Sequence, residues 1–226
     1  MTLTRAQSRR AARVYEKIEV GFYVGKFEQY REVTLTTKAG VNNDLKTFTA
    51  DMRKLIMALR RRGYEFEYLC ERGLAPKNKL IHNHMVLRMI KTPNGGYYLD
   101  GKLVSQLWQK IHGAYRVEVS DIKSKKRYTK YVARHMIKAM KEIDARLMIS
   151  SGWMPQGWAK VRKLLCAWVL VGSPEPEARK QRWSEMKTLY HRWAAGNQVV
   201  LPYRKYWIDL QEYGKSEYDF DLFVRI

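Results

Sequence analysis

The sequence predicts an α+β fold: a central antiparallel sheet with helices mainly on one face, followed by a C-terminal helical extension. Two observations predict this class. Segments with alternating apolar residues, typical of strands, are interleaved with longer segments whose apolar residues recur at helical spacing. The order is strand, helix, strand, strand, helix, strand, helix, which suits an antiparallel sheet covered by helices. From Leu147 onward, tryptophan-rich helical segments replace this alternation.

The alternating region opens with a strand and a helix. Residues 32–37 read EVTLTT, in which valine and leucine alternate with threonine, the period expected of a strand rich in β-branched residues. Apolar residues then recur at helical spacing from Leu45 to Leu59, and residues 42–44 offer side chains that cap helix N-termini. Gly63 follows, so one amphipathic helix of about five turns is expected.

Two further strands are expected to form a hairpin. Residues 64–71, YEFEYLCE, place tyrosine, phenylalanine and cysteine on one face and mainly glutamate on the other. The next strand is KLIHNHMVLRM, residues 79–89. Between them lie the turn formers Gly73, Pro76 and Asn78. The sequence therefore predicts two neighbouring antiparallel strands.

A helix, a strand and a second helix complete the alternating region. Residues 103–113, LVSQLWQKIHG, have helical spacing, and residues 115–122, YRVEVSDI, alternate. Residues 126–143, KRYTKYVARHMIKAMKEI, return to helical spacing. These segments supply the last strand and the last helix of the predicted sheet domain.

Composition divides the chain into three expected parts. Residues 1–30 are basic and weakly patterned, which indicates an N-terminal arm with a short helix around residues 11–18. Residues 31–146 contain the alternating elements and form the expected α+β domain. Residues 147–226 are expected to form a mainly helical extension with two tryptophan-rich helices. Its tryptophans are assigned to a core rather than to base stacking.

The charge of the chain indicates a polyanionic partner. Its 226 residues include 43 lysines and arginines against 22 aspartates and glutamates, a formal charge of +21. Such a charge is either neutralised by a partner or tolerated as self-repulsion. Nucleic acid fits better than an anionic membrane surface, because the 15 tyrosines and 7 tryptophans suit base stacking beside phosphate contacts.

The sequence also predicts a cytoplasmic protein without a membrane partner. The start, MTLTRAQSRRAARVYEKIEV, lacks the apolar core of a signal peptide, and the apolar run LLCAWVLVG near residue 164 is too short to span a membrane. Cys70 and Cys166 lie far apart, without the spacing of a zinc site. A reducing host cytoplasm is the expected compartment.

Two histidines in the third strand indicate a metal site. His82 and His84 lie two residues apart and share a strand face, about 7 Å apart at the backbone, so both imidazoles can bind one ion. A turn centred near Pro76 places Glu71 opposite His82 as a carboxylate ligand. These ligands favour a divalent cation such as Mn²⁺ or Mg²⁺. The alternative is a pair of ordinary half-buried histidines satisfied by hydrogen bonds.

The last helix completes a family resemblance. In KYVARHMIK, residues 130–138, Tyr131, Arg134 or His135, and Lys138 fall on one helix face. With EVTLTT and the H-x-H pair upstream, this order resembles the HUH endonuclease superfamily, in particular the rolling-circle replication initiators of plasmids and viruses. The resemblance covers about residues 31–140 and implies an RRM- or ferredoxin-like sheet of the HUH type.

The resemblance implies an enzyme that nicks and rejoins single-stranded DNA with a tyrosine nucleophile. Tyr131 would attack a phosphodiester to give a 5′-phosphotyrosine and a free 3′-hydroxyl, and Lys138 would favour its phenolate. A divalent metal at His82, His84 and Glu71 would polarise the phosphate. The residues expected to contact DNA are Thr34, Thr36, Lys126, Arg127, Lys130 and Arg134.

The chain departs from the family pattern at two places. Arg134 and His135 stand where two-tyrosine initiators have a lysine and the second tyrosine, so Tyr131 alone remains as nucleophile. Asn83 replaces the usual hydrophobic residue between the two histidines. With a single tyrosine, termination would need a second copy of the chain or a water molecule activated by a carboxylate.

The expected partners are single-stranded DNA and origin DNA, with a host helicase and polymerase, because no ATP-binding phosphate loop is visible. Three alternatives remain open. A single-tyrosine transposase or a conjugative relaxase of the same superfamily would use the same residues. A non-catalytic RNA- or DNA-binding module with an RRM-like sheet would need neither Tyr131 nor a metal.

Overall fold

The computed structural model describes residues 4–40, 44–75, 79–114, 116–142, 147–171, 175–203 and 206–216. They belong to two compact units. The first unit contains the residues up to Glu19 and from Gly25 to Trp153, and the second contains Val20–Val24 and the residues from Met154 onward. The expected change of character at residue 147 lies just before this division.

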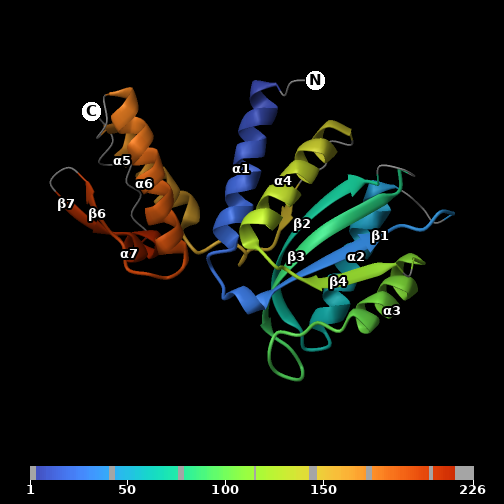
Figure 1. Ribbon diagram of the computed structural model, residues 1–226. Helices are drawn as coiled ribbons and strands as arrows, with labels where there is room; N and C mark the ends of the chain where they lie inside the picture. Colours follow the sequence, from blue (N-terminus) through green and yellow to red (C-terminus); the bar gives the residue numbers. More distant parts are fainter. Residues whose placement is uncertain are drawn as a thin grey trace. The chain divides into compact units, whose positions relative to one another are not determined.

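The first unit has the predicted order of strands and helices (Figure 1). All strand pairs of its sheet are antiparallel, which confirms the α+β class. Asp44 caps the first helix of this series, since its side chain accepts a hydrogen bond from the Thr47 backbone N–H. The elements after the N-terminal helix are η1 (Phe27–Gln29), β1 (Tyr30–Thr36), α2 (Leu45–Arg60), β2 (Glu65–Leu74), β3 (Ile81–Lys91), α3 (Gly101–His112), β4 (Val117–Asp121), α4 (Lys125–Glu142) and β5 (Met148–Ile149).

The N-terminal stretch contains a longer helix than the sequence predicted. Helix α1 spans Arg5–Gly21, where only a short helix around residues 11–18 was expected. Val14 and Ile18 are buried on one face of α1, at i and i+4. The indole nitrogen of Trp153 donates a 3.0 Å hydrogen bond to the Lys17 carbonyl. Trp153 lies far from α1 in the sequence, so a local pattern of residues cannot show this contact or the longer helix that it accompanies.

The sheet separates an apolar face from a polar face. Its strand order is β4-β1-β3-β2-β5. On the apolar face, alternate residues such as Val33, Cys70 and Met85 pack against α2 and α3 in the main hydrophobic core. The other face contains His82 and His84, and α4 packs over it through contacts with β2.

Asn83 lies on the apolar face and is fully buried. Its Oδ1 accepts a 3.1 Å hydrogen bond from the Leu35 backbone N–H. Its Nδ2 lies 3.0 Å from Met52 Sδ and 3.2 Å from Cys70 Sγ. The amide is therefore satisfied within the hydrophobic core, as buried polar groups usually are.

The hairpin of β2 and β3 is formed in a different register from the one expected. Its ladder ends with Leu74 opposite Ile81, while Pro76 and Asn78 lie outside the described residues. This register sets Glu71 opposite His84, and the expected pair of Glu71 with His82 is wrong. Strand β2 continues to Leu74, beyond residue 71 where the alternating pattern ends. Its residues pair with β3 residues two positions further along the chain than expected.

The second unit is mainly helical. Trp168 and Trp193 are buried, which agrees with a core role, whereas Trp183 is 37% exposed. The sequence did not indicate the two-stranded hairpin that accompanies the helices. No helix among the described residues combines the length and the apolar composition needed to cross a membrane. The elements are α5 (Trp158–Val171), α6 (Pro176–Ala194), β6 (Val200–Tyr203), β7 (Tyr206–Asp209) and α7 (Leu210–Lys215).

Candidate metal and nucleophile site

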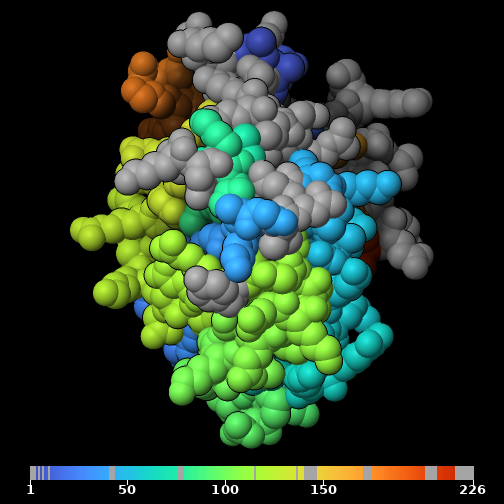
Figure 2. Space-filling model, turned by 90° about the vertical axis from the view of Figure 1, so that its right-hand side faces the viewer, coloured from blue at the N-terminus to red at the C-terminus, as the bar shows by residue number. Residues whose placement is uncertain are grey.

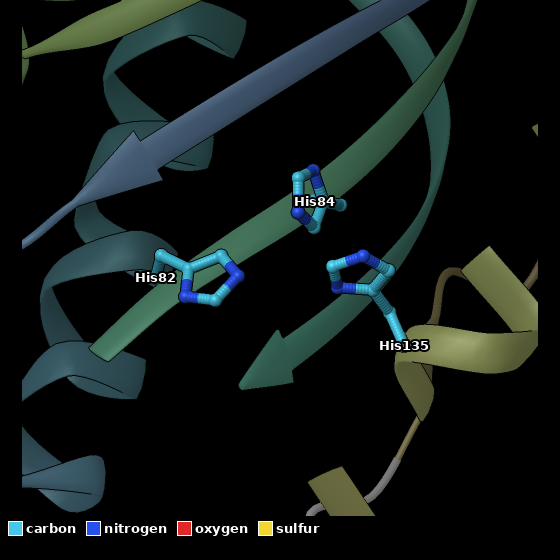
Figure 3. Close-up of side chains that lie close together, drawn as sticks. All are labelled: His82, His84 and His135. Carbon is cyan, nitrogen blue, oxygen red and sulfur yellow. The ribbon is translucent and has the colours of Figure 1, made fainter. Parts of the chain in front are cut away.

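Three histidines converge on the polar face of the sheet. His82 and His84 project from β3, and His135 projects toward them from α4 (Figure 3). One nitrogen from each ring lies within 4.8 Å of one from each of the others. The His84 ring centroid is 5.1 Å from that of His82 and 5.0 Å from that of His135. The group could hold a metal ion.

Two of the three imidazoles, those of His82 and His135, favour the neutral form. Burial lowers the pKa of His82 to about 4, with His84, His135 and Lys138 adding to the effect. Burial also lowers the pKa of His135, and His84 and Lys138 act in the same direction. A metal binds the neutral form of histidine, so at neutral pH these rings need no proton loss before binding.

Tyr131 lies directly against the histidine cluster. Its hydroxyl is 3.1 Å from His84 Nε2, and its ring centroid is 4.3 Å from that of His135, one helical turn further along α4. The side chain is still 39% exposed. An ion bound through His84 Nε2 would therefore lie beside the phenolic oxygen.

The orientation of the His84 ring is set by β1. His84 Nδ1 is 3.2 Å from Glu32 Oε1 and 3.3 Å from Thr34 Oγ1. When Nδ1–H donates to the Glu32 carboxylate, Nε2 is left as an acceptor for the Tyr131 hydroxyl. Carboxylates orient metal-binding histidines in the same way.

Glu71 is buried beside the cluster but is not one of the three converging residues. It is fully inaccessible, and neither carboxylate oxygen has a hydrogen-bond partner among the described residues. Burial raises its pKa to about 7, although His84 and Arg72 act in the opposite direction. Of the expected ligands, His82 and His84 belong to the converging group, whose third member is His135 rather than Glu71.

A row of polar residues crosses the sheet at this level. In the ladders Glu71 pairs with His84, His84 with Thr34, and Thr34 with Glu118. The row therefore contains one residue from each of β2, β3, β1 and β4. It places carboxylates on both sides of the histidine beneath Tyr131.

Burial and the nearby carboxylates keep Tyr131 protonated. Burial, followed by the charges of Glu32, Glu71 and Glu118, raises the pKa of Tyr131 to about 12. Lys138, expected to favour the phenolate, is exposed two turns along α4 and instead lowers the pKa of His82 and His135. A phenolate at this position would need a cation close to the hydroxyl to form at neutral pH.

Tyr128 and Tyr131 occupy different environments. Tyr128 is only 8% exposed, and its ring centroid is 6.0 Å from that of Tyr131. Burial and the neighbouring Glu32 hold the pKa of Tyr128 well above its usual value. Of the two tyrosines, Tyr131 is the one whose hydroxyl lies against the cluster.

Two pockets meet at this site. The first, here called the Lys38 pocket, has a volume of about 490 Å³, and the second, the Glu118 pocket, about 500 Å³. His84 and Tyr131 line both. The Lys38 pocket is also lined by Thr36, Thr37, Lys38, Ala75, Leu80, Ile81, His82, Ala114, Arg116 and His135. The Glu118 pocket is also lined by Glu32, Thr34, Glu118, Asp121, Ile122, Lys123, Ser124, Arg127 and Tyr128.

Of the six residues expected to bind DNA, three line these pockets, namely Thr34, Thr36 and Arg127. Thr34 contacts His84, and Thr36 donates a 3.0 Å hydrogen bond to the Arg116 carbonyl at the Lys38 pocket. Arg127 lines the Glu118 pocket. In Figure 2, long side chains of the yellow-green segment that includes α4 project from the surface. The basic ridge, defined as the exposed residues four apart on α4, comprises Lys126, Lys130, Arg134 and Lys138.

Sequence reasoning missed three features of the site: Glu32, Glu118 and the place of His135 in the histidine cluster. Glu32 precedes Thr34 by two residues and so shares its strand face, a signal that was present. His135 follows Tyr131 by one helical turn. The position of Glu118 depends on the pairing of β1 with β4, which no local pattern shows.

A scan against protein-family models finds no match for this chain, and searches of curated proteins and of solved structures find no significant similarity.

Proposed function

We propose that this chain is a metal-dependent endonuclease that nicks and rejoins single-stranded DNA through Tyr131. The observation that carries the proposal is the 3.1 Å contact between the Tyr131 hydroxyl and His84 Nε2, at the edge of a three-histidine cluster. A tyrosine that served only to fill the core would be buried, whereas the Tyr131 side chain is 39% exposed and its hydroxyl faces a group of potential metal ligands. A tyrosine placed beside a metal site is suited to covalent attack on phosphate.

His82, His84 and His135 would hold the metal. Two features fit a bound cation: the histidine nitrogens within 4.8 Å of one another, and the buried Glu71 carboxylate, which has no hydrogen-bond partner in the described part of the chain. When bound, a divalent cation would polarise the scissile phosphate and offset the charge that the three glutamates direct at Tyr131. Imidazole ligands suit transition metals better than Mg²⁺, so of the two expected ions we propose Mn²⁺.

The reaction exchanges one phosphoester for another. The phenolic oxygen of Tyr131 forms a bond to phosphorus, and the bond from phosphorus to the 3′-oxygen breaks. The 3′-oxygen takes up a proton, while the Tyr131 proton is lost. Because the number of phosphoester bonds is unchanged, a 3′-hydroxyl can reverse the step without ATP. The product is a 5′-phosphotyrosine and an extendable 3′-end.

The basic ridge would hold the strand across α4. Lys126, Lys130, Arg134 and Lys138 are spaced by one helical turn, about 6 Å, along the same helix as Tyr131. Exposed cations in a row suit a phosphate backbone, and the formal charge of +21 adds a long-range attraction. Arg127 would act at the rim of the Glu118 pocket.

Rolling-circle initiation is the biological role we propose for this activity. A single attacking tyrosine leaves a covalent intermediate that a second copy of the chain or a water molecule must resolve. Unwinding and synthesis would fall to a host helicase and polymerase. A transposase or relaxase would share the chemistry and differ in its DNA substrate.

The test is a covalent trap. The full chain is incubated with Mn²⁺ and a labelled pool of single-stranded oligonucleotides of random sequence, denatured, and separated by size. The expected result is a labelled adduct that resists denaturation and maps to Tyr131 by peptide mass analysis. Binding without any adduct would overturn the proposal and favour a non-catalytic binding module.

A further inference from the structure

The two pockets beside Tyr131 differ in charge. The Lys38 pocket is lined by Lys38 and Arg116, and its described lining residues include no carboxylate. The Glu118 pocket contains Glu32, Glu118 and Asp121 together with Lys123 and Arg127. A phosphate group is attracted to the first environment and repelled by the carboxylates of the second. The two pockets therefore suit different parts of a nucleotide.

Among the described residues, Glu118 has no hydrogen bond or ion pair, unlike the other two carboxylates of the Glu118 pocket. Glu32 is engaged by His84 Nδ1 at 3.2 Å. Asp121 forms an ion pair with Arg31, whose Nε lies 3.2 Å from Asp121 Oδ1. Glu118 is exposed and lies in the same cross-strand row as Thr34 and His84. Its carboxylate is thus an acceptor near the nucleophile.

The remaining walls of this pocket suit a flat ring. Tyr128, Tyr131 and Ile122 offer aromatic and apolar surface, and aromatic side chains stack on bases of any sequence. A volume of about 500 Å³ lies within the range of ordinary ligand pockets. Carboxylates read bases by accepting hydrogen bonds from exocyclic amino groups, which cytosine, adenine and guanine have and thymine lacks.

We propose that the Glu118 pocket holds the nucleobase next to the cleaved phosphodiester, and that Glu118 selects a base with an exocyclic amino group against thymine. The inference rests on the proposed nicking function and adds a specificity to it. The Lys38 pocket then takes the phosphate and sugar on the other side of the nick. Base readout and phosphate positioning are separated in this way in nucleic-acid recognition generally.

The experiment sequences both products formed from a random oligonucleotide pool: the strand attached to the protein and the released strand that ends in the 3′-hydroxyl. For the wild-type chain, thymine should be depleted at least about fivefold at one position next to the cleaved bond, the lower end of what one base contact contributes. The variant Glu118→Gln has both a donor and an acceptor and should restore thymine to near its frequency in the pool. Glu65→Gln, an exposed carboxylate on β2 outside both pockets, should keep the wild-type preference.

A second measurement does not depend on the variant. In the best oligonucleotide, the selected base is replaced by its analogue without the amino group, such as purine for adenine. The analogue should lower the rate of cleavage by the wild-type chain as much as Glu118→Gln lowers the rate of cleavage of the parent oligonucleotide. When the variant cleaves the analogue, the rate should fall no further. Adducts without a base preference, or with one unchanged in Glu118→Gln, would overturn this inference and leave the nicking function standing. If no adduct formed with any oligonucleotide, the proposed nicking function itself would be wrong.

Discussion

The two faces of the sheet contain the same chemical pair in different surroundings. On the polar face, His84 Nδ1 lies 3.2 Å from a Glu32 carboxylate oxygen. On the side of α2 and α3, His112 Nδ1 lies 3.0 Å from Asp51 Oδ2. Each imidazole is thus oriented by one carboxylate. A histidine–carboxylate pair by itself does not distinguish a functional site from a structural one.

The second ring nitrogen makes the difference. His112 Nε2 lies 3.2 Å from Thr37 Oγ1, and the ring stacks on Trp108 with centroids 4.4 Å apart. The ring is buried in the core, so every group is already satisfied and nothing can enter. His84 Nε2 instead faces the Tyr131 hydroxyl at the junction of two pockets. A histidine–carboxylate pair becomes chemically useful when its second ring nitrogen faces a pocket and another reactive group.

The strongest contrast is expected between the two tyrosines of α4. Tyr131→Phe removes the attacking oxygen and should reduce adduct formation at least about 1,000-fold while DNA binding is retained. Tyr128→Phe should keep most of the activity, because it leaves the 3.1 Å contact between the Tyr131 hydroxyl and His84 Nε2 in place. Gel separation of trapped adducts measures both. A nucleotide attached to Tyr128 would contradict the assignment.

Mn²⁺ binding should depend on the histidines of the polar face and not on His112 on the opposite side of the sheet. Alanine at His82, His84 or His135 should weaken Mn²⁺ binding by more than about 100-fold, beyond the effect of losing an outer contact. His112→Ala should leave Mn²⁺ affinity unchanged and lower the stability of the fold. Calorimetric titration and thermal unfolding of the full chain separate the two effects. If the variant with alanine at both His82 and His84 bound Mn²⁺ as tightly as the wild type, the proposed metal site would be wrong.

The orienting carboxylate can be tested on its own. Glu32→Gln weakens the hold on His84 Nδ1 and should lower Mn²⁺ affinity about 10–100-fold. Glu65→Gln, an exposed carboxylate in the same sheet but outside both pockets, should bind Mn²⁺ like the wild type. Equal affinities in Glu32→Gln and the wild type would show that the metal does not depend on this orientation.

The pair of Asp51 and His112 should make the stability of the fold depend on pH. Burial acts to raise the pKa of Asp51, but hydrogen bonds and charges from Lys54 and His112 outweigh it and leave the pKa below its usual value. A carboxyl with a lowered pKa in the folded state adds stability above about pH 4 and loses it as the pH falls through the lowered value.

Asp51→Asn should therefore lower the free energy of unfolding at pH 7 by about 1–3 kcal/mol, the cost of a disrupted buried hydrogen bond. The difference from the wild type should shrink as the pH falls below about 4. Urea unfolding at a series of pH values measures it. A difference independent of pH would mean that the Asp51 charge contributes nothing.

The smallest effects are expected for single cations of the basic ridge. Neutralising Lys130 or Arg134 with glutamine should lower the slope of log affinity for single-stranded DNA against log salt by up to about 0.7 per residue. Lys46→Gln, an exposed lysine on α2, should leave the slope unchanged. If Lys46→Gln changed the slope as much as the ridge variants, binding would be spread over the charge of the whole chain.

The order of strands and helices could be read from the sequence because each element has its own period. The two-residue alternation placed His82 and His84 on one face and Asn83 on the other, and the helical period placed Tyr131 and His135 together. These relations depend on local geometry alone. The structure confirmed the order of elements and the shared face of the histidines.

The tertiary structure decided what the local periods could not. The β2–β3 register moved Glu71 from His82 to His84, and the pairing of β1 with β3 and β4 brought Glu32 and Glu118 to the site. The packing of α4 on the polar face selected His135 as the third converging residue. Pairing and packing join segments far apart in the chain, and the free energies that select them come from contacts absent from any short window of sequence.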